Sequence, residues 1–517
     1  MRGRVAHPVA PCLLTSPGPS PDSGPPMSGS ARRLRAWLVA AACAGGIAAW
    51  PAGARAHVGG GAFILLLPTH LYVLGGAIVV AASFVLLALV PARLLAGVES
   101  LRIRLGTADI PGRRAFSTGA SLLSLAAAVA LIVAGVRGSR DPLANPLPLF
   151  VWTVWWIGFT YLHAAFGNLW AHLNPWTGLY RVVTSAGRLR QWREIPPLAY
   201  PERAGHWPAV AGFVPFAWFE LIHPAPSDPA VLAGAVAGYL LTHFAGVFVF
   251  GERWLRQAEP FSVFFRVVSW LAPLGIGAPA RRAADGAGTR EAHLMVPTLK
   301  LLAVEAGGLS GAAFVLLMLA SVSFDGLSRT FAWLHFLGAN PLMYPGRTAL
   351  IGPNTFGFLA LFAVFCLVYL LAVSLVSPLA MVRAPVRRLA GLFVPSLVPI
   401  ACGYHFAHYL PVFLVDVQYA VRAASDPFAR GWDLLGTRDL HVVTSFLSDP
   451  GRVYAIWHTQ VALIVGAHVA SVFVAHALAL RLTGRAAVAA RSQLPLVLLM
   501  IGYTVLGLWL LSTPAVG

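Results

Sequence analysis

The chain has 517 residues, of which 58% are hydrophobic and only 11% are charged. Soluble globular proteins carry about 25% charged residues, so this composition excludes an ordinary soluble domain. The net charge of +18 comes from arginines in short segments between apolar runs, which excludes a compact basic domain that binds nucleic acid. We expect a lipid bilayer as the surroundings and no nucleic-acid partner.

The N-terminal residues have the features of a processed leader. We expect residues 1–26, rich in Pro, Ser and Gly, to be a non-native or disordered extension. Residues 27–56 read as a signal peptide, with a basic start, an apolar core and the cleavage pattern Ala54-Arg55-Ala56. Cleavage there makes His57 the first residue of the mature chain. The alternative is an uncleaved helix ending near Trp50.

Residues 57–517 are predicted to form one integral membrane domain, an all-α bundle of about ten spans. About twenty helical residues cross the hydrocarbon core. The segment 261–275 is too short and carries Arg266 in its middle, so we expect an interfacial or re-entrant helix there. The predicted spans lie near 71–92, 117–136, 149–168, 207–223, 229–250, 297–321, 355–378, 390–415, 453–480 and 494–512.

The arginine-rich segments orient this bundle. Basic residues gather on the cytoplasmic side of bacterial membrane proteins, and the arginines of 93–116, 169–206 and 251–296 fall on one side if 261–275 does not cross. We therefore expect an inner-membrane protein with a periplasmic mature N-terminus. Two periplasmic loops follow, near 322–354 and 416–452. Asp325 and Asp433 fall in these loops. Three roles are open to each residue, namely to cap a helix, to line a substrate entrance or to bind a partner, and capping is the simplest.

Ionisable side chains inside spans are costly and indicate function. Glu220 and His223 are three residues apart, and so are His405 and His408, so the members of each pair share a helix face. The remaining candidates in or beside the spans are His163, Glu305, Asp416, His458, His468 and His476.

The outer histidines predict a metal centre. His223, His405, His408 and His458 are expected near the periplasmic surface, where imidazoles and a carboxylate suit a transition metal such as Zn or Cu. If His57 is the first residue, its free amino group and its imidazole would together supply two donor atoms to the metal. Two other interpretations of these histidines remain open. The histidines can be structural, or His468 can bind a haem b axially with His405 or His408 as the second ligand.

Several stretches of the chain resemble a family of bacterial multi-pass membrane proteins that are commonly labelled fenitrothion hydrolase. The stretches are "GFVPFAWFELIHPAPSDP", "FDGLSRT", "AHY", "SDPFARGWDLLGT" and "GAHVASVFVAHALAL". The resemblance implies hydrolysis of an organophosphate triester with release of a nitrophenol. In that reading His405, His408 and either His223 or His458 hold the metal, and Glu220 is a ligand or the general base.

Two other functions fit the same residues. The first is copper or other metal handling or transport, favoured by His57 and the outer histidines. The second is a haem-bearing or quinone-linked redox subunit, favoured by His468. A partner membrane or periplasmic subunit is compatible with any of the three.

Overall fold

The computed structural model describes residues 69–90, 102–107, 113–276, 291–304, 306–340 and 346–513. The chain divides into the units Met1–Ile64 and Leu65–Gly517, and every described residue belongs to the second unit. The predicted extension, the predicted signal peptide, His57 and Glu305 lie outside the described residues.

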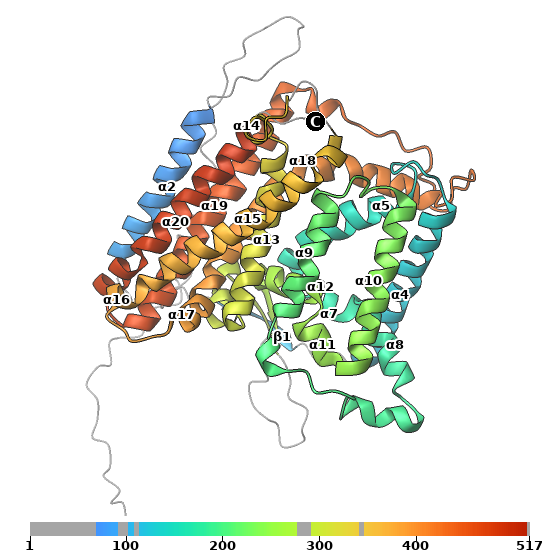
Figure 1. Cartoon of the computed structure of the whole chain (residues 1–517), viewed down its shortest axis with the longest axis horizontal. Helices are drawn as coiled ribbons and strands as arrows, with labels where there is room; N and C mark the ends of the chain where they lie inside the picture. Colours follow the sequence, from blue (N-terminus) through green and yellow to red (C-terminus); the bar gives the residue numbers. More distant parts are fainter. Residues whose placement is uncertain are drawn as a thin grey trace, which may run out of the picture. The chain divides into compact units, whose positions relative to one another are not determined.

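Long apolar helices dominate the described part of the chain (Figure 1). Nine helical stretches there are long and apolar enough to cross a membrane, which confirms the predicted all-α, multi-pass architecture. They are α2 (Thr69–Leu89), α4 (Arg113–Arg137), α5–η1–α6 (Pro146–Phe166), α10 (Pro229–Phe250), α13 (Gly308–Ser328), α15–α16 (Gly346–Ala380), α17–η7–α18 (Val386–Ser425), α19 (Pro450–Thr483) and α20 (Ala486–Ser512).

Helix α9 (Trp207–Leu221) occupies the place of the remaining predicted span. It has 15 residues and packs beside α13. At its start the His206 backbone N–H donates to Ser310 Oγ at 3.0 Å, and its far end reaches α18 through Glu220 and Tyr409. Helix α9 therefore runs in the same direction as α13.

Short segments connect the long helices. They include the pieces joined into the long stretches and several independent turns of helix. Their bounds are α5 (Pro146–Pro148), η1 (Leu149–Gly158), α6 (Phe159–Phe166), α7 (Trp170–Leu173), α8 (Pro175–Val183), η2 (Gly187–Arg193), η3 (Glu202–Ala204), α11 (Glu252–Gln257), α12 (Pro260–Val268), η4 (Ser269–Leu271), η5 (Pro297–Ala303), α14 (Phe331–Phe336), α16 (Val376–Ala380), α17 (Val386–Phe393), η7 (Val394–Leu397) and η8 (Ser445–Leu447). The long helices beside α16 and η7 are α15 (Gly346–Ser374) and α18 (Val398–Ser425).

A small antiparallel sheet brings two arginine-rich segments together. It contains β1 (Arg102–Thr107), β2 (Leu274–Ile276) and β3 (Glu291–Met295) in the order β1-β3-β2. Strand β1 belongs to the segment 93–116, and the other two strands belong to 251–296. The sequence placed these segments on the same side, and their pairing agrees with that placement. We call this end of the bundle the sheet end, and the opposite end the α14 end.

The segment 261–275 does not cross the bundle. Helix α10 runs antiparallel to α4, because Arg140 after α4 pairs with Asp228 before α10 at 2.5 Å, so α10 ends at the sheet end. Helix α12 and η4 then lead directly into β2. Most residues of α12 are buried against α6, α7 and α9, so this short helix lies inside the protein rather than along its surface.

Two predicted boundaries were wrong. Gly307 and Gly308 both have positive φ, 75° and 65°, and they separate η5 from α13, so this span is 308–328 instead of 297–321. Asp325 is consequently inside a helix and not in a periplasmic loop. Helix α18 continues to Ser425, which shortens the predicted 416–452 loop.

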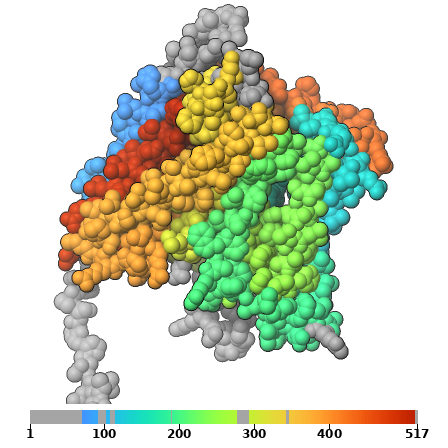
Figure 2. Space-filling view, viewed as in Figure 1, coloured from blue at the N-terminus to red at the C-terminus, as the bar shows by residue number. Residues whose placement is uncertain are grey.

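Helix α13 is the most enclosed of the long helices. Every residue from Ser310 to Asp325 is buried, because α9, α15, α17, α18 and α20 all pack against it. Helices α2 and α4 instead expose leucines such as Leu86 and Leu123. In Figure 2 the gold α15 lies beside the red α20 on the face shown. The core of the bundle therefore follows α13 from the sheet end to the α14 end.

Candidate functional site

An acid–base cluster lies where α9, α13 and α18 meet near the α14 end. It contains Glu220, Asp325, Arg329, His408 and Tyr409. The carboxylates come from the last turns of α9 and α13, and the histidine and tyrosine come from α18. The cluster therefore depends on the packing of three helices.

Asp325 is the most buried charged member of the cluster, with 2% of its surface exposed. Its Oδ1 lies 2.9 Å from Arg329 Nη2, and its Oδ2 lies 3.0 Å from His408 Nε2. Arg329 is one helical turn after Asp325, and its side chain is 51% exposed. A buried carboxylate is costly unless it is paired, and these two partners occupy both of its oxygens.

The contact with Asp325 orients the His408 imidazole. A carboxylate only accepts hydrogen bonds, so Nε2 carries the proton and Nδ1 keeps its lone pair when the ring is neutral. The Tyr404 ring stacks on the imidazole, with centroids 5.9 Å apart and planes inclined by 27°. The His408 side chain is 21% exposed. This is the arrangement of a histidine base positioned by a carboxylate.

Glu220 and Tyr409 form the second pair of the cluster. The Tyr409 hydroxyl donates to Glu220 Oε1 at 3.1 Å. The rings of Tyr409 and His408 are 4.8 Å apart and nearly perpendicular, so the two pairs are in contact. Arg347 donates to the backbone oxygens of Glu220 and His223, at 3.0 and 3.2 Å, which holds the end of α9 in place.

The other predicted ligands on α9 and α18 face different neighbours. His223 Nδ1 accepts from the Ala225 backbone N–H at 3.1 Å, and its ring stacks on Phe219. His405 is 3% exposed and packs edge-on against Trp156, with centroids 4.9 Å apart. Neither ring nitrogen of His405 has a hydrogen-bond partner among the described residues. Residues three apart on a helix differ by about 60° in direction, which separates His405 from His408.

The predicted metal ligand and the predicted haem ligand on α19, His458 and His468, lie elsewhere in the bundle. His458 Nδ1 donates to the Tyr454 oxygen at 2.7 Å, and its Nε2 lies 3.2 Å from the Tyr72 hydroxyl on α2. His468 is 2% exposed, and its Nδ1 donates to the Ile464 oxygen at 2.8 Å. Its Nε2 is buried and has no hydrogen-bond partner in the part of the chain that the structure describes.

Within the described residues, no group of three or more His, Cys, Asp or Glu side chains is arranged to hold a metal ion. The predicted convergence of His223, His405, His408 and His458 on one metal is therefore not seen, because these histidines have separate partners. His163 is likewise structural: Nδ1 donates to the Phe159 oxygen, and Nε2 accepts from the Trp170 N–H. A role for His57 stays a prediction.

Sequence reasoning missed three members of the cluster. Asp325 and Arg329 were available as an i,i+4 pair in "FDGLSRT", but the misplaced end of the span put them in a loop. Tyr409 follows His408 directly and was visible only as part of "AHY". The signal that was missed is the spacing of four, which places an acid and a base on one helix face.

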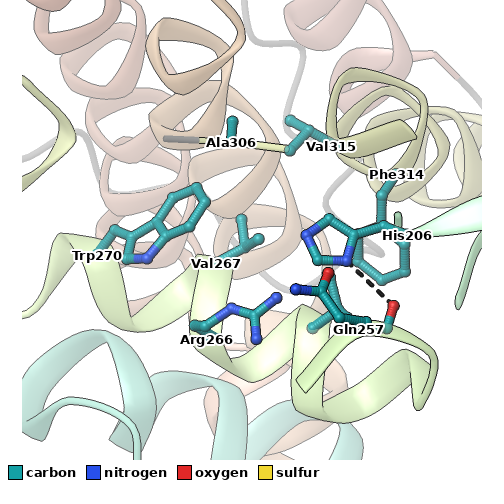
Figure 3. A pocket seen from close by; sticks show the side chains of 10 residues that line it. His206, Gln257, Arg266, Val267, Trp270, Ala306, Phe314 and Val315 are labelled. Carbon is teal, nitrogen blue, oxygen red and sulfur yellow. Dashed lines mark hydrogen bonds between the residues drawn. The ribbon is translucent and has the colours of Figure 1, made fainter. Parts of the chain in front are cut away.

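A second polar site is a cavity of about 150 Å³ at the sheet end, which Figure 3 shows from close by. His206, Gln257, Arg266 and Trp270 line it together with apolar side chains. His206 Nδ1 lies 3.0 Å from the Gln257 backbone oxygen. Burial lowers the pKa of His206 below its ordinary value, and the nearby Arg266 adds to this shift, so the imidazole is neutral at pH 7.

Comparison of the chain with protein-family models, curated proteins and solved structures gave no match. The resemblance to proteins labelled fenitrothion hydrolase thus stays a prediction from sequence motifs.

Proposed function

We propose that this protein is a membrane-embedded hydrolase of organophosphate triesters and that the acid–base cluster carries its reaction. The observation that supports the proposal is the position of Asp325 between His408 and Arg329, at 3.0 and 2.9 Å. A buried carboxylate that orients a histidine prepares that histidine to take a proton from water.

The cluster supplies the parts that such a reaction needs. His408 Nδ1 accepts a proton as water forms a bond to phosphorus, and the bond from phosphorus to the aryl oxygen breaks. The nitrophenolate leaves with that electron pair, and a dialkyl phosphate remains. Arg329 is half exposed and close to the base, so its free N–H groups can stabilise charge on the phosphoryl oxygen. The Tyr409–Glu220 pair packs against the base and fixes its position.

The test is release of 4-nitrophenol from a paraoxon-type triester by the purified protein in detergent. We expect His408→Ala and Asp325→Asn each to lower the rate about 100-fold or more, because general-base catalysis contributes at least that factor. His335→Ala is the matched control, since His335 lies on α14 at the same end, is exposed and is outside the cluster. Equal rates in all three variants would remove the cluster from the reaction.

A second candidate function is supported by the unpartnered nitrogens of His405 and His468. Imidazole nitrogens that are buried without a hydrogen bond are available as ligands to haem or to a redox metal. This reading predicts a Soret band in the visible spectrum of the purified protein, and it predicts that His468→Ala removes that band. A colourless preparation without a transition metal would exclude it.

A further inference from the structure

The cavity at the sheet end combines three features that attract negative charge. It lies where α9 and α13 begin and where α11 joins α12, and it is partly enclosed. Figure 3 shows the Arg266 guanidinium lying near the Gln257 and His206 side chains. No Asp or Glu is among the described residues that line it.

The first feature is the charge of Arg266. Its Nη1 donates to the Arg256 backbone oxygen at 2.6 Å, and in the described part of the chain it forms no ion pair with a carboxylate. Glu259, on the same segment, is engaged elsewhere: it accepts from Tyr239 and from the backbone N–H groups of Phe261 and Ser262. Arg266 therefore brings a positive charge that forms no direct ion pair among the described residues, although the Glu259 carboxylate is close enough to act on it.

The second feature is His206, which is 9% exposed. A backbone carbonyl only accepts hydrogen bonds, so the contact with the Gln257 oxygen places the proton on Nδ1. Nε2 lies against Gly307, where an added Cβ would come within 3.0 Å of it. Among the described residues, this ring nitrogen has no hydrogen-bond partner. An anion bound beside it would favour protonation of Nε2, which makes that nitrogen a second cationic donor.

The third feature is the start of α13. This helix has 21 residues, and Gly307 before it makes no side-chain capping hydrogen bond. Gly311, in the first turn of the helix, lines the cavity. The Gly311 N–H itself donates to the Gly307 oxygen at 3.4 Å, so the helix acts here through its dipole, which favours an anion near its N-terminus.

We propose that this cavity binds a small oxyanion of the phosphate type, held by Arg266, His206 and the N-terminus of α13. An engineered protein cavity of about 150 Å³ accommodates a benzene ring, so a phosphate group fits here, whereas a nucleotide does not. Free inorganic phosphate and the phosphate of an anionic lipid headgroup present the same chemistry to these residues. The site is separate from the acid–base cluster and does not depend on the proposed reaction.

The proposal is tested by thermal unfolding of the purified full-length protein in detergent at constant ionic strength. Inorganic phosphate is titrated against chloride, and phosphatidylglycerol is titrated against phosphatidylcholine. We expect phosphate to raise the melting temperature saturably, and Arg266→Gln to weaken the apparent affinity by about tenfold to 100-fold, as for loss of a hydrogen bond to a charged group. Arg253→Gln is the matched control, because Arg253 is an exposed arginine on the same side that pairs with Glu202.

The second arm distinguishes the two sources of phosphate. If only the anionic lipid stabilises the protein, and Arg266→Gln removes that effect, the ligand is a headgroup. Val267→Phe is a second variant that keeps the charge but fills the space, and it should also abolish the response. No response to either ligand, or a response that is unchanged in Arg266→Gln and Val267→Phe, would overturn the proposal.

Discussion

His408 Nε2 lies 3.0 Å from Asp325 Oδ2, although 83 positions separate the two residues in the chain. The contact joins the middle of α18 to the last turns of α13, at a place where Asp325 is almost fully buried. Arg329 supplies the second partner of the carboxylate. This contact is the centre of the acid–base cluster.

Asp325→Asn should destabilise the protein. The substitution removes the negative charge that the Arg329 guanidinium and the His408 N–H both contact, and loss of one member of a buried ion pair costs several kcal/mol. Because Arg329 is half exposed and can turn to water, we expect a loss of about 2 kcal/mol. The measurement is unfolding in detergent. Asp439→Asn, at a side chain that is 95% exposed, should leave the unfolding unchanged.

Tyr409→Phe and Glu220→Gln should show coupled effects on stability. Each substitution weakens the same 3.1 Å hydrogen bond, so the double variant should be less destabilised than the sum of the single variants. A coupling of about 1 kcal/mol is typical for one hydrogen bond. Additive effects in this double-mutant cycle would show that the pair contributes nothing as a unit.

The loop after α18 should lose order at low pH. The Ser425 hydroxyl donates to Asp433 at 2.6 Å, and the Arg438 backbone N–H donates to it at 3.1 Å. These hydrogen bonds hold the pKa of Asp433 below its ordinary value, and the bond from Ser425 has the largest effect. A lowered pKa means that the stabilisation is complete above the unfolded value of about 3.9 and is lost as the pH falls through the folded value.

Hydrogen exchange of this loop measures that change. Corrected for intrinsic rates, exchange of residues 431–438 should increase between pH 6 and pH 3. Asp433→Asn should remove the pH dependence at residues 433–438, whereas Gly431, whose N–H donates to Asp426, should keep it. A wild-type loop that is equally protected at both pH values would contradict the prediction.

Cysteine labelling should place the two ends of the bundle on opposite sides of the membrane. In a cysteine-free background, Leu434→Cys in the loop after α18 should react with an impermeant maleimide from the periplasm. Arg193→Cys in η2 should react only after the membrane is opened. Both positions are exposed. Labelling of Arg193→Cys in intact spheroplasts would reverse the orientation that we infer from the arginines.

The mature chain should begin at His57, and its metal content should depend on that residue. N-terminal sequencing checks the start, and elemental analysis before and after chelation checks the metal. If a metal is bound by the free amine and imidazole, His57→Ala should remove it and a start elsewhere in the chain should prevent its binding. Metal that persists in His57→Ala would assign it to other residues.

The sequence by itself determined the class of the protein and most of its helices. Apolar runs of about twenty residues have few stable conformations in a bilayer other than helices, because each backbone group must find its partner within the segment. The same reasoning identified 261–275 as too short to cross. It failed at α13, where a continuous apolar run concealed the break at Gly307 and Gly308.

The candidate site was determined only in part by the sequence. Glu220 and His408 were selected because an ionisable side chain in a span is costly, and both belong to the cluster. Periodicity could not show that His408 meets Asp325 while His405 meets Trp156, or that His458 is turned toward Tyr72 on α2. These side-chain contacts depend on which helices are neighbours and on how each helix is rotated about its axis. Only the tertiary structure decides this, because the apolar faces that drive packing are nearly uniform around these helices.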